Sequence, residues 1–394
     1  MKQFLAALAL ILSSLAPIQA ATHLVLPFFN LTQSNNLDWI GESISESIRE
    51  ALASEGVLVV ERHDREEVYR RLAFRPYALL TRASVVEIAQ ALDADQVIYG
   101  QFELIPPANG QTNTRGSLRI SAHTIDVRRI RKGPEYAETG SLEDLAALQS
   151  HIAWQALQFA VPKGAPSEEQ FRRRRPPVRV DAIENYIRGL LSTIPAQRHR
   201  FFTQSARLDP NYPPPCFELG RMLFESKDYA AAAEWLKKVP ESAPGFREAT
   251  FLLGLALYNR NDFPAAQAAF QLVAATVPLN EVLNNLGAAQ SRRNAPESVE
   301  NLERALEGDP SDPDYHFNVG YALWKQGKFD QAADRFRAVL ERTPDDEEAT
   351  IFLGRCLKKA GPRPNDPRSE GRERLKLAYQ ESAWWQLKAM FEKK

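Results

Sequence analysis

Glu61, His63 and Asp64, with Glu66 and Glu67 just behind them, form a charged cluster in which carboxylates stand beside an imidazole. Side chains of these types could transfer protons or hold a divalent metal ion. The cluster follows a short apolar run and precedes a helical pattern, and acidic residues are favoured at the start of a helix. We therefore interpret it as a solvated turn between a strand and a helix.

The rest of the sequence lacks the spacings that metal binding and nucleophilic catalysis require. There is no HExxH or CxxC motif, no glycine-rich phosphate loop and no serine in a nucleophile-elbow setting. The histidines lie at no metal-ligand spacing, and they are His23, His63, His123, His151, His199 and His316. We predict a protein that is not an enzyme and has no cofactor.

The composition favours a soluble two-domain protein. The chain has 394 residues, of which 44% are hydrophobic and 25% charged, and its formal net charge is -1. So small a charge creates no global field that would attract nucleic acid or an anionic membrane, so we expect no nucleic-acid partner. The run Arg172–Arg175 is a local exception. Pro176 and Pro177 follow it, and we interpret it as a solvated interdomain linker, with contact to an acidic partner or a lipid headgroup as the alternative.

The first twenty residues have the pattern of a secretory signal peptide. Lys2 supplies a positive charge, Phe4 to Leu15 is an apolar stretch too short to span a membrane, and small residues lead to Ala20. Cleavage after Ala20 is expected, although Ile18 stands where alanine is preferred. No cysteine follows the apolar stretch, and no later apolar run approaches the length of a transmembrane helix. We expect a periplasmic or secreted protein without an integral membrane segment in the mature chain; an uncleaved anchor is the alternative.

A repeat of 33 or 34 residues runs through the C-terminal half. Glycines recur at Gly220, Gly254, Gly287, Gly320 and Gly354, and prolines precede them by nine or ten residues at Pro210, Pro244, Pro278, Pro310 and Pro344. This period is typical of solenoids built from paired helices. Such chains form extended concave surfaces that hold other molecules.

The repeats resemble tetratricopeptide repeats. When the glycine is numbered 8, the unit of Gly320 has Leu323, Ala332, Phe336, Val339 and Pro344 at positions 11, 20, 24, 27 and 32. Small residues at 8 and 20 allow two antiparallel helices to cross closely, and a proline at 32 ends the second helix. The unit of Gly287 is irregular, and the units at both ends are imperfect.

The resemblance implies a partner-binding groove lined by the first helix of each unit. This groove is aromatic in its middle and basic at both ends, which suits a protein or peptide partner with apolar anchors and acidic or carboxylate groups. Alternatively, several of these aromatic residues pack between repeats or against the array's own C-terminal helix. The lysines of the family's best-known peptide clamp are missing, although Asn284, Asn285 and Asn318 supply amides. The candidate groove residues are Phe217, Arg221, Phe224, Phe251, Leu255, Tyr258, Asn284, Phe317, Tyr321, Trp324, Lys325, Arg355 and Lys358.

The N-terminal region predicts a small α/β domain. We expect strands at 23–29 and 57–60, helices at 39–54, 66–74 and 142–159, a helix at 85–92 opened by a Ser84/Glu87 capping box, and a hairpin of 96–105 with 118–127. With Leu26-Pro27-Phe28 and Trp39-Ile40, this region resembles the amino-terminal domain of TolB and FlgO-like proteins. The resemblance implies partner binding in the cell envelope. The loops 75–82 and 106–116 are either partner-specific or neutral insertions.

The cysteines and the chain end carry two further expectations. Cys216 and Cys356 belong to distant repeats, so we predict two buried free thiols. Residues 361–371 contain three prolines and precede a predicted helix at 372–391. We expect Trp384 and Trp385 in that helix to cover the last repeat; docking to a partner or a membrane is the alternative.

These expectations define one architecture and two functions. The fold class is α+β, with a small TolB-like α/β domain followed by an all-α tetratricopeptide solenoid. The boundaries are 1–20 for the signal peptide, 21–163 for the α/β domain, 164–180 for the linker, 181–360 for about five repeats, and 361–394 for a second linker and a capping helix. We expect an exported, non-catalytic scaffold for a bacterial envelope complex. The alternative is a regulatory subunit or activator of an envelope enzyme, or of a signalling system, acting through the α/β domain.

Overall fold

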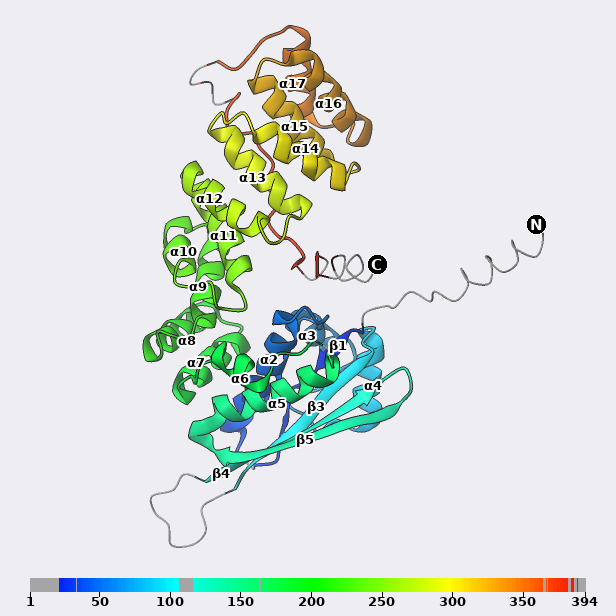
Figure 1. The fold of residues 1–394 in the computed structure, drawn as a ribbon, viewed down its shortest axis with the longest axis vertical. Coiled ribbons are helices and arrows are strands. Elements are labelled where there is room, and N and C mark those ends of the chain that lie inside the picture. Colours follow the sequence, from blue (N-terminus) through cyan, green and yellow to red (C-terminus); the bar gives the residue numbers. More distant parts are fainter. Residues whose placement is uncertain are drawn as a thin grey trace, which may run out of the picture. The chain divides into compact units, whose positions relative to one another are not determined.

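The computed structural model describes residues 21–32, 34–105, 116–162, 164–363, 366, 368–381, 384–385 and 388. The chain divides into two compact units between Arg188 and Gly189. Figure 1 shows a sheet with helices in the first unit and paired helices in the second. The predicted signal peptide and residues 106–115 of the predicted hairpin tip lie outside the described residues.

The N-terminal unit is built on a mixed sheet in the order β1-β3-β4-β5. Strands β1 (His23–Val25) and β2 (Phe29–Asn30) both pair in parallel with β3 (Gln96–Ile105), and β3 and β4 (Ser117–Asp126) form the predicted antiparallel hairpin. Strand β5 (Arg131–Ser141) adds to β4 and was not predicted. It reads RKGPEYAETGS, which has no apolar alternation, so only its pairing identifies it.

Helices cover the sheet on both faces. Helix α2 (Asp38–Ser54) contacts β1, β2 and β3, and helix α5 (Leu145–Ala160) contacts β4, β5 and α2. Helices α3 (Arg62–Arg71) and α4 (Arg82–Ala91) join Val97 and Ile125 in a separate apolar cluster. Neighbouring residues of a strand point to opposite faces, so Val97 and Ile98 serve the two layers separately.

Predictions for three short segments of this unit differ from the structure. Residues 57–60 form only an isolated bridge between Val59 and His23. Helix α4 begins earlier than predicted, because Thr81 is its N-cap and accepts a hydrogen bond from the Ser84 amide. His63 and Asp64 are exposed, as expected, but they lie in the first turn of α3 and not in a turn before it, because this helix begins at Arg62 and not at the predicted Glu66.

The basic run is not a fully solvated linker. A short helix, α6 (Glu168–Arg173), buries Phe171 completely, and the Arg175 guanidinium lies 4.0 Å from the centre of that ring. Arg175 also donates to Ser54 at 2.6 Å, and Arg174 contacts Glu55 at 3.0 Å. Two of the four arginines therefore bind the end of α2, and the chain stays with the N-terminal unit up to Arg188 in α7 (Val180–Leu191).

The C-terminal unit is an array of antiparallel helix pairs. The first helices of the pairs are α9 (Pro214–Glu225), α11 (Phe246–Asn259), α13 (Asn280–Arg292), α15 (Pro313–Lys325) and α17 (Glu347–Leu357). The second helices are α8 (Pro195–Leu208), from the unit before, and α10 (Tyr229–Leu236), α12 (Phe263–Ala274), α14 (Ser298–Gly308) and α16 (Phe329–Arg342). Left-handed residues at Lys227, Asn261, Asn294, Gly327 and Lys359 follow the first helices.

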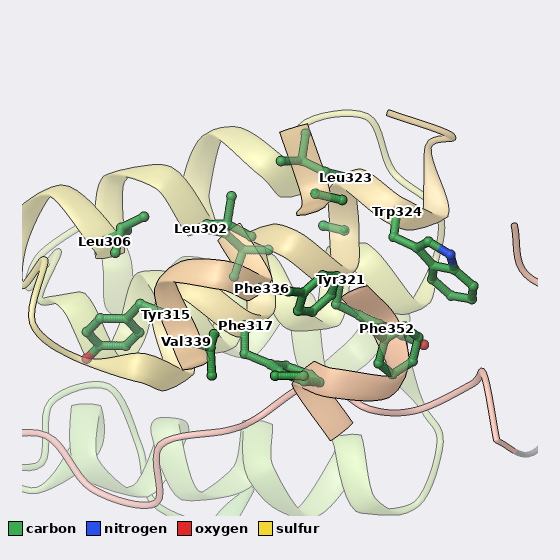
Figure 2. Close-up of a cluster of buried hydrophobic side chains, with 14 of the residues drawn as sticks. Leu302, Leu306, Tyr315, Phe317, Tyr321, Leu323, Trp324, Phe336, Val339 and Phe352 are labelled. Carbon is green, nitrogen blue, oxygen red and sulfur yellow. The ribbon is translucent and has the colours of Figure 1, made fainter. Parts of the chain in front are cut away.

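Aromatic residues form the core of the last repeats. Phe317, Trp324 and Phe336 are completely buried, and Phe352 stacks on Phe336 with ring centres 5.6 Å apart. Figure 2 shows these side chains meeting between the helices of α14 to α17. Cys216 and Cys356 are buried free thiols, as predicted. None of the helices in the described residues is long and apolar enough to cross a membrane.

The C-terminal segment differs most from its prediction. Residues 372–380 are not helical but extended; helical residues are described only at 381, 384, 385 and 388. Figures 1 and 2 show this part of the chain as a red coil passing along the first helices of the repeats. We refer to residues 368–381 as the C-terminal strap.

Candidate functional site

The C-terminal strap is held by its main chain. Asn318 donates to the Arg374 carbonyl at 2.7 Å and accepts from the Arg374 amide at 2.8 Å. Asn285 makes the same pair of bonds with Lys376, both at 2.8 Å. Asn284 also donates to the Arg374 carbonyl and accepts from Asn318. The three asparagines are fully buried, so they fix the register of an extended chain through groups that every residue possesses.

A cationic and hydroxyl-rich site encloses Glu373. Its side chain has no exposed surface, and its carboxylate accepts from Tyr258 at 3.1 Å and from Ser291 at 2.9 Å. Arg292 and Lys325 each lie 3.9 Å away. Burial and the Glu373 charge raise the pKa of Tyr258, so that hydroxyl remains a donor. Burial lowers the pKa of Lys325, and Glu373 opposes this change.

An acidic site receives the guanidinium of Arg374. Asp346 binds it through two nitrogens at 2.8 and 3.0 Å, Asp314 contacts it at 3.3 Å, and Glu348 lies 3.6 Å away. The guanidinium is also 3.7 Å from the centre of the Phe317 ring, which adds a cation–π contact. Burial disfavours the charged form, but Asp346 and Asp314 outweigh it and raise the pKa of Arg374.

The acidic site extends to Lys376. Its ammonium lies 2.7 Å from Asp312 and 2.8 Å from Asp314. Burial disfavours the charge of Lys376, yet these two carboxylates raise its pKa. Four carboxylates on α15, on α17 and at the N-caps of these helices thus face Arg374 and Lys376, and Glu348 also accepts from Arg372 of the strap at 3.0 Å.

The two ends of the strap make different contacts. Toward α11, Tyr379 packs on Phe251 with ring centres 4.8 Å apart, and Glu381 accepts from Arg247 at 2.7 Å. Burial and Glu381 raise the pKa of Tyr379. At the other end, Tyr321 donates to the Ser369 carbonyl at 2.7 Å. The strap therefore runs back along the array from the last repeat to α11.

Most of the candidate groove residues lie along this C-terminal segment. Six of them contact the strap, and these are Phe251, Tyr258, Asn284, Phe317, Tyr321 and Lys325. Trp324 donates to the Ala360 carbonyl at 2.8 Å, and Arg355 lies 3.5 Å from Asp366. The hypothesis of aromatics packed against the array's own C-terminal segment thus holds for several of them, although the segment is extended and not helical.

The remaining candidates have other surroundings. Leu255 is buried in the core of α9 to α13, and Phe217 and Phe224 pack against the same cluster. Arg221 pairs with Glu218 at 2.6 Å, and Lys358 is exposed at the end of α17. Asn285 and Asn318 were expected only to supply amides. The acidic residues were not predicted, because the repeat assigns no groove position to N-cap residues such as Asp312 and Asp346.

The comparisons with known proteins identify the repeats. A tetratricopeptide-repeat family model matches residues 251–313, 288–347 and 320–361, which are the helix pairs that hold the strap. Residues 251–361 are tetratricopeptide repeats. A search of curated proteins gives no match to the chain.

Solved structures with similar folds cover parts of the chain. Residues 41 to the end of MamA from Desulfovibrio magneticus RS-1 are 24% identical, with a TM-score of 0.37, and the match covers 41% of this chain and 92% of that one. YrrB, a tetratricopeptide protein with an unusual peptide-binding site, is 20% identical with a TM-score of 0.35, covering 43% and 87%. The LpoB C-terminal domain from Salmonella enterica is 19% identical with a TM-score of 0.24, covering 34% and 91%. These TM-scores are low, so the assignment of the repeats depends on the family match and on the observed helix pairs.

A buried charged network lies in the N-terminal unit, around Glu42. Glu42 is 2% exposed and accepts from Arg62 at 2.9 Å and from Arg65 at 2.5 Å. Arg65 also donates to Ser45 and to the Val25 carbonyl. These groups bind one another inside the fold, so we assign the network a structural role. Within the described residues, no group of histidine, cysteine and acidic side chains could hold a metal ion.

Proposed function

We propose that this protein is an exported, non-catalytic scaffold that binds extended segments of partner proteins in its tetratricopeptide groove. The observation that carries the proposal is the paired hydrogen bonding of Asn285 and Asn318 to the main chain of the strap. Bonds to main-chain groups give affinity for an extended chain of any sequence, and the flanking side-chain sites give selectivity. Solenoid repeats present this kind of surface in a long row.

The setting that we propose is the bacterial cell envelope. The pattern of Lys2, the apolar run 4–15 and Ala20 supports export. The resemblance of residues 21–163 to the TolB amino-terminal domain supports a role in assembly or regulation of an envelope complex. On this proposal the N-terminal unit contacts the complex and the repeats hold a second component.

A second candidate function is regulation of an envelope enzyme through the N-terminal unit. The observation that favours it is strand β5, which lies at the edge of the sheet and, among the described strands, pairs with β4 alone. An unpaired strand edge can accept a strand from another protein. In this case the repeats serve only to position the unit.

Capture of partners from an envelope extract tests both functions. The wild-type chain is compared with Asn285→Ala plus Asn318→Ala, and Asn301→Ala is the matched control because Asn301 bonds to Gln290 and not to the strap. We expect the double variant alone to lose partners. Partners that all three chains retain equally would refute groove binding and favour the N-terminal unit. Export is checked by N-terminal sequencing of the mature protein from the periplasm, where a chain that still begins at Met1 would contradict cleavage.

A further inference from the structure

The C-terminal strap occupies the groove as a bound peptide would, although it belongs to the same chain. We propose that the strap is an internal competitor whose residues specify the ligand: an extended protein segment with an acidic residue, basic residues one and three positions later, and an aromatic residue six positions later. In the strap these residues are Glu373, Arg374, Lys376 and Tyr379. The inference rests on the proposed groove function and adds the ligand's chemistry and a requirement that the strap leave.

The acidic position of the ligand follows from the site around Glu373. Without a carboxylate there, Arg292 and Lys325 would be partly buried cations that lack their counter-charge. Buried charge without a partner is costly, and the hydroxyls of Tyr258 and Ser291 would also lose their acceptor. An occupant that displaces the strap must therefore bring an acidic group to this point.

The basic positions follow from the acidic site. Asp312, Asp314, Asp346 and Glu348 each contact Arg374 or Lys376. Removing these two cations would leave Asp312, Asp314 and Asp346 close together without these counter-charges, whereas Glu348 would keep its contact with Arg372 at 3.0 Å. The Asp346 carboxylate binds the guanidinium through two nitrogens beside the Phe317 ring, a geometry that favours arginine over lysine at the first basic position.

The strap can leave because the repeats do not depend on it for their core. The buried cluster of α14 to α17 contains no strap residue, and Leu375 and Tyr379 only pack against the edge of the neighbouring cluster. The strap has no regular secondary structure between 372 and 380, and Leu377 is 69% exposed. Its docking depends on side-chain and main-chain contacts that a second peptide could replace one for one.

The tether sets how strongly the strap competes. Residues 358–367 connect α17 to the strap, and a short linker gives a tethered segment an effective concentration on the order of millimolar. If the strap occupies the groove in about 99% of molecules, a free ligand binds about 100-fold more weakly than it would bind a groove without the strap.

The test measures binding of a fluorescent peptide with the sequence of residues 368–385. The full chain is compared with Arg374→Glu plus Lys376→Glu, which should release the strap. Arg304→Glu plus Lys328→Glu is the matched control, since it makes the same charge change at exposed positions on α14 and at the start of α16, and the Arg304 guanidinium bonds to Asn301 and not to the strap. We expect the strap variant to bind the peptide about 100-fold more tightly than the wild type and the control. A peptide with the same two substitutions should bind to none of the three.

If the wild type and the strap variant bind the peptide equally, the strap does not compete for the groove. If the natural and the charge-reversed peptides bind equally, the groove does not select the proposed charge pattern. If the double variant does not fold, the milder substitution Lys376→Ala replaces it, and we expect this variant to bind the peptide about tenfold more tightly than the wild type. Light scattering shows whether the wild type is monomeric; a dimer that the strap variant abolishes would make a second copy the occupant. Partner capture that depends on Asn285 without peptide binding would refute the motif and leave the scaffold function intact.

Discussion

Replacing Asn285 with alanine tests the main-chain recognition directly. The Lys376 amide lies in an extended segment outside any helix or strand, and its hydrogen-bond acceptor is Asn285 Oδ1 at 2.8 Å. The same side chain donates to the Lys376 carbonyl at 2.8 Å. Each bond contributes about 1 kcal/mol net, so Asn285→Ala should weaken local docking of the strap by about 2 kcal/mol.

The assay is hydrogen exchange of the Lys376 amide under native conditions. Exchange through local opening depends on the opening free energy, so a loss of about 2 kcal/mol should accelerate it about 30-fold. Asn301→Ala is the control, because Asn301 lies on α14, the second helix of the same repeat, and bonds to Gln290 at 2.9 Å. A Lys376 amide that exchanges at the wild-type rate in Asn285→Ala would refute the assignment of these bonds as the strap's anchor.

Three further predictions concern the two folds. Gly254→Ala would place a Cβ 2.7 Å from the Phe270 ring of α12 and should lower the free energy of unfolding in urea by about 1–3 kcal/mol. The Cβ of Gly354→Ala meets no atom within 4 Å, so this substitution should raise the free energy of unfolding by up to about 1 kcal/mol. Glu42→Gln leaves Arg65 buried without its counter-charge and should lower the free energy of unfolding by about 3 kcal/mol. The control Glu66→Gln, at a more exposed carboxylate, should lower it by less than about 1 kcal/mol, and equal losses would contradict a buried network. Burial opposes ionisation of Glu42, but its two arginines hold the pKa of that carboxyl below its usual range. The stabilisation that the Glu42 charge provides is therefore fully present above about pH 5 and is lost as the pH falls below about 4. Over this range the free energy of unfolding should decrease more for the wild type than for Glu42→Gln.

Elements with a strong apolar period were predictable. Ile40, Ile44, Ile48 and Leu52 recur every four residues, and all are completely buried on one face of α2. The glycines at position 8 and the alanines at position 20 were equally informative, because close helix crossing requires small residues at fixed spacing. Gly354 is the exception, since no second helix follows α17 in the described residues. Strand β5 lacked such a signal, since its residues are mostly polar and its pairing with β4 comes from the connecting turn.

The groove was predictable only in part. Phe251, Tyr258 and Tyr321 were located from repeat positions, and each contacts the C-terminal strap. The acidic residues that bind Arg374 were missed, because Asp346 is also an N-cap and its second role depends on a segment 28 residues away. Residues 372–381 of the strap were predicted as part of a helix, because the local spacing of apolar residues gives no sign that asparagines elsewhere bind the main chain of this segment.

The sequence by itself determined that the C-terminal half is a row of helix pairs and that the first helices present aromatic and amide side chains. These properties follow from steric and hydrophobic requirements that repeat within each unit of 33 or 34 residues. Only the tertiary structure decided what lies against those helices. The answer depends on main-chain hydrogen bonds and charge pairs between distant residues, such as Asn285 and Lys376, which are 91 positions apart, and Arg247 and Glu381, which are 134 positions apart. No local period encodes these contacts.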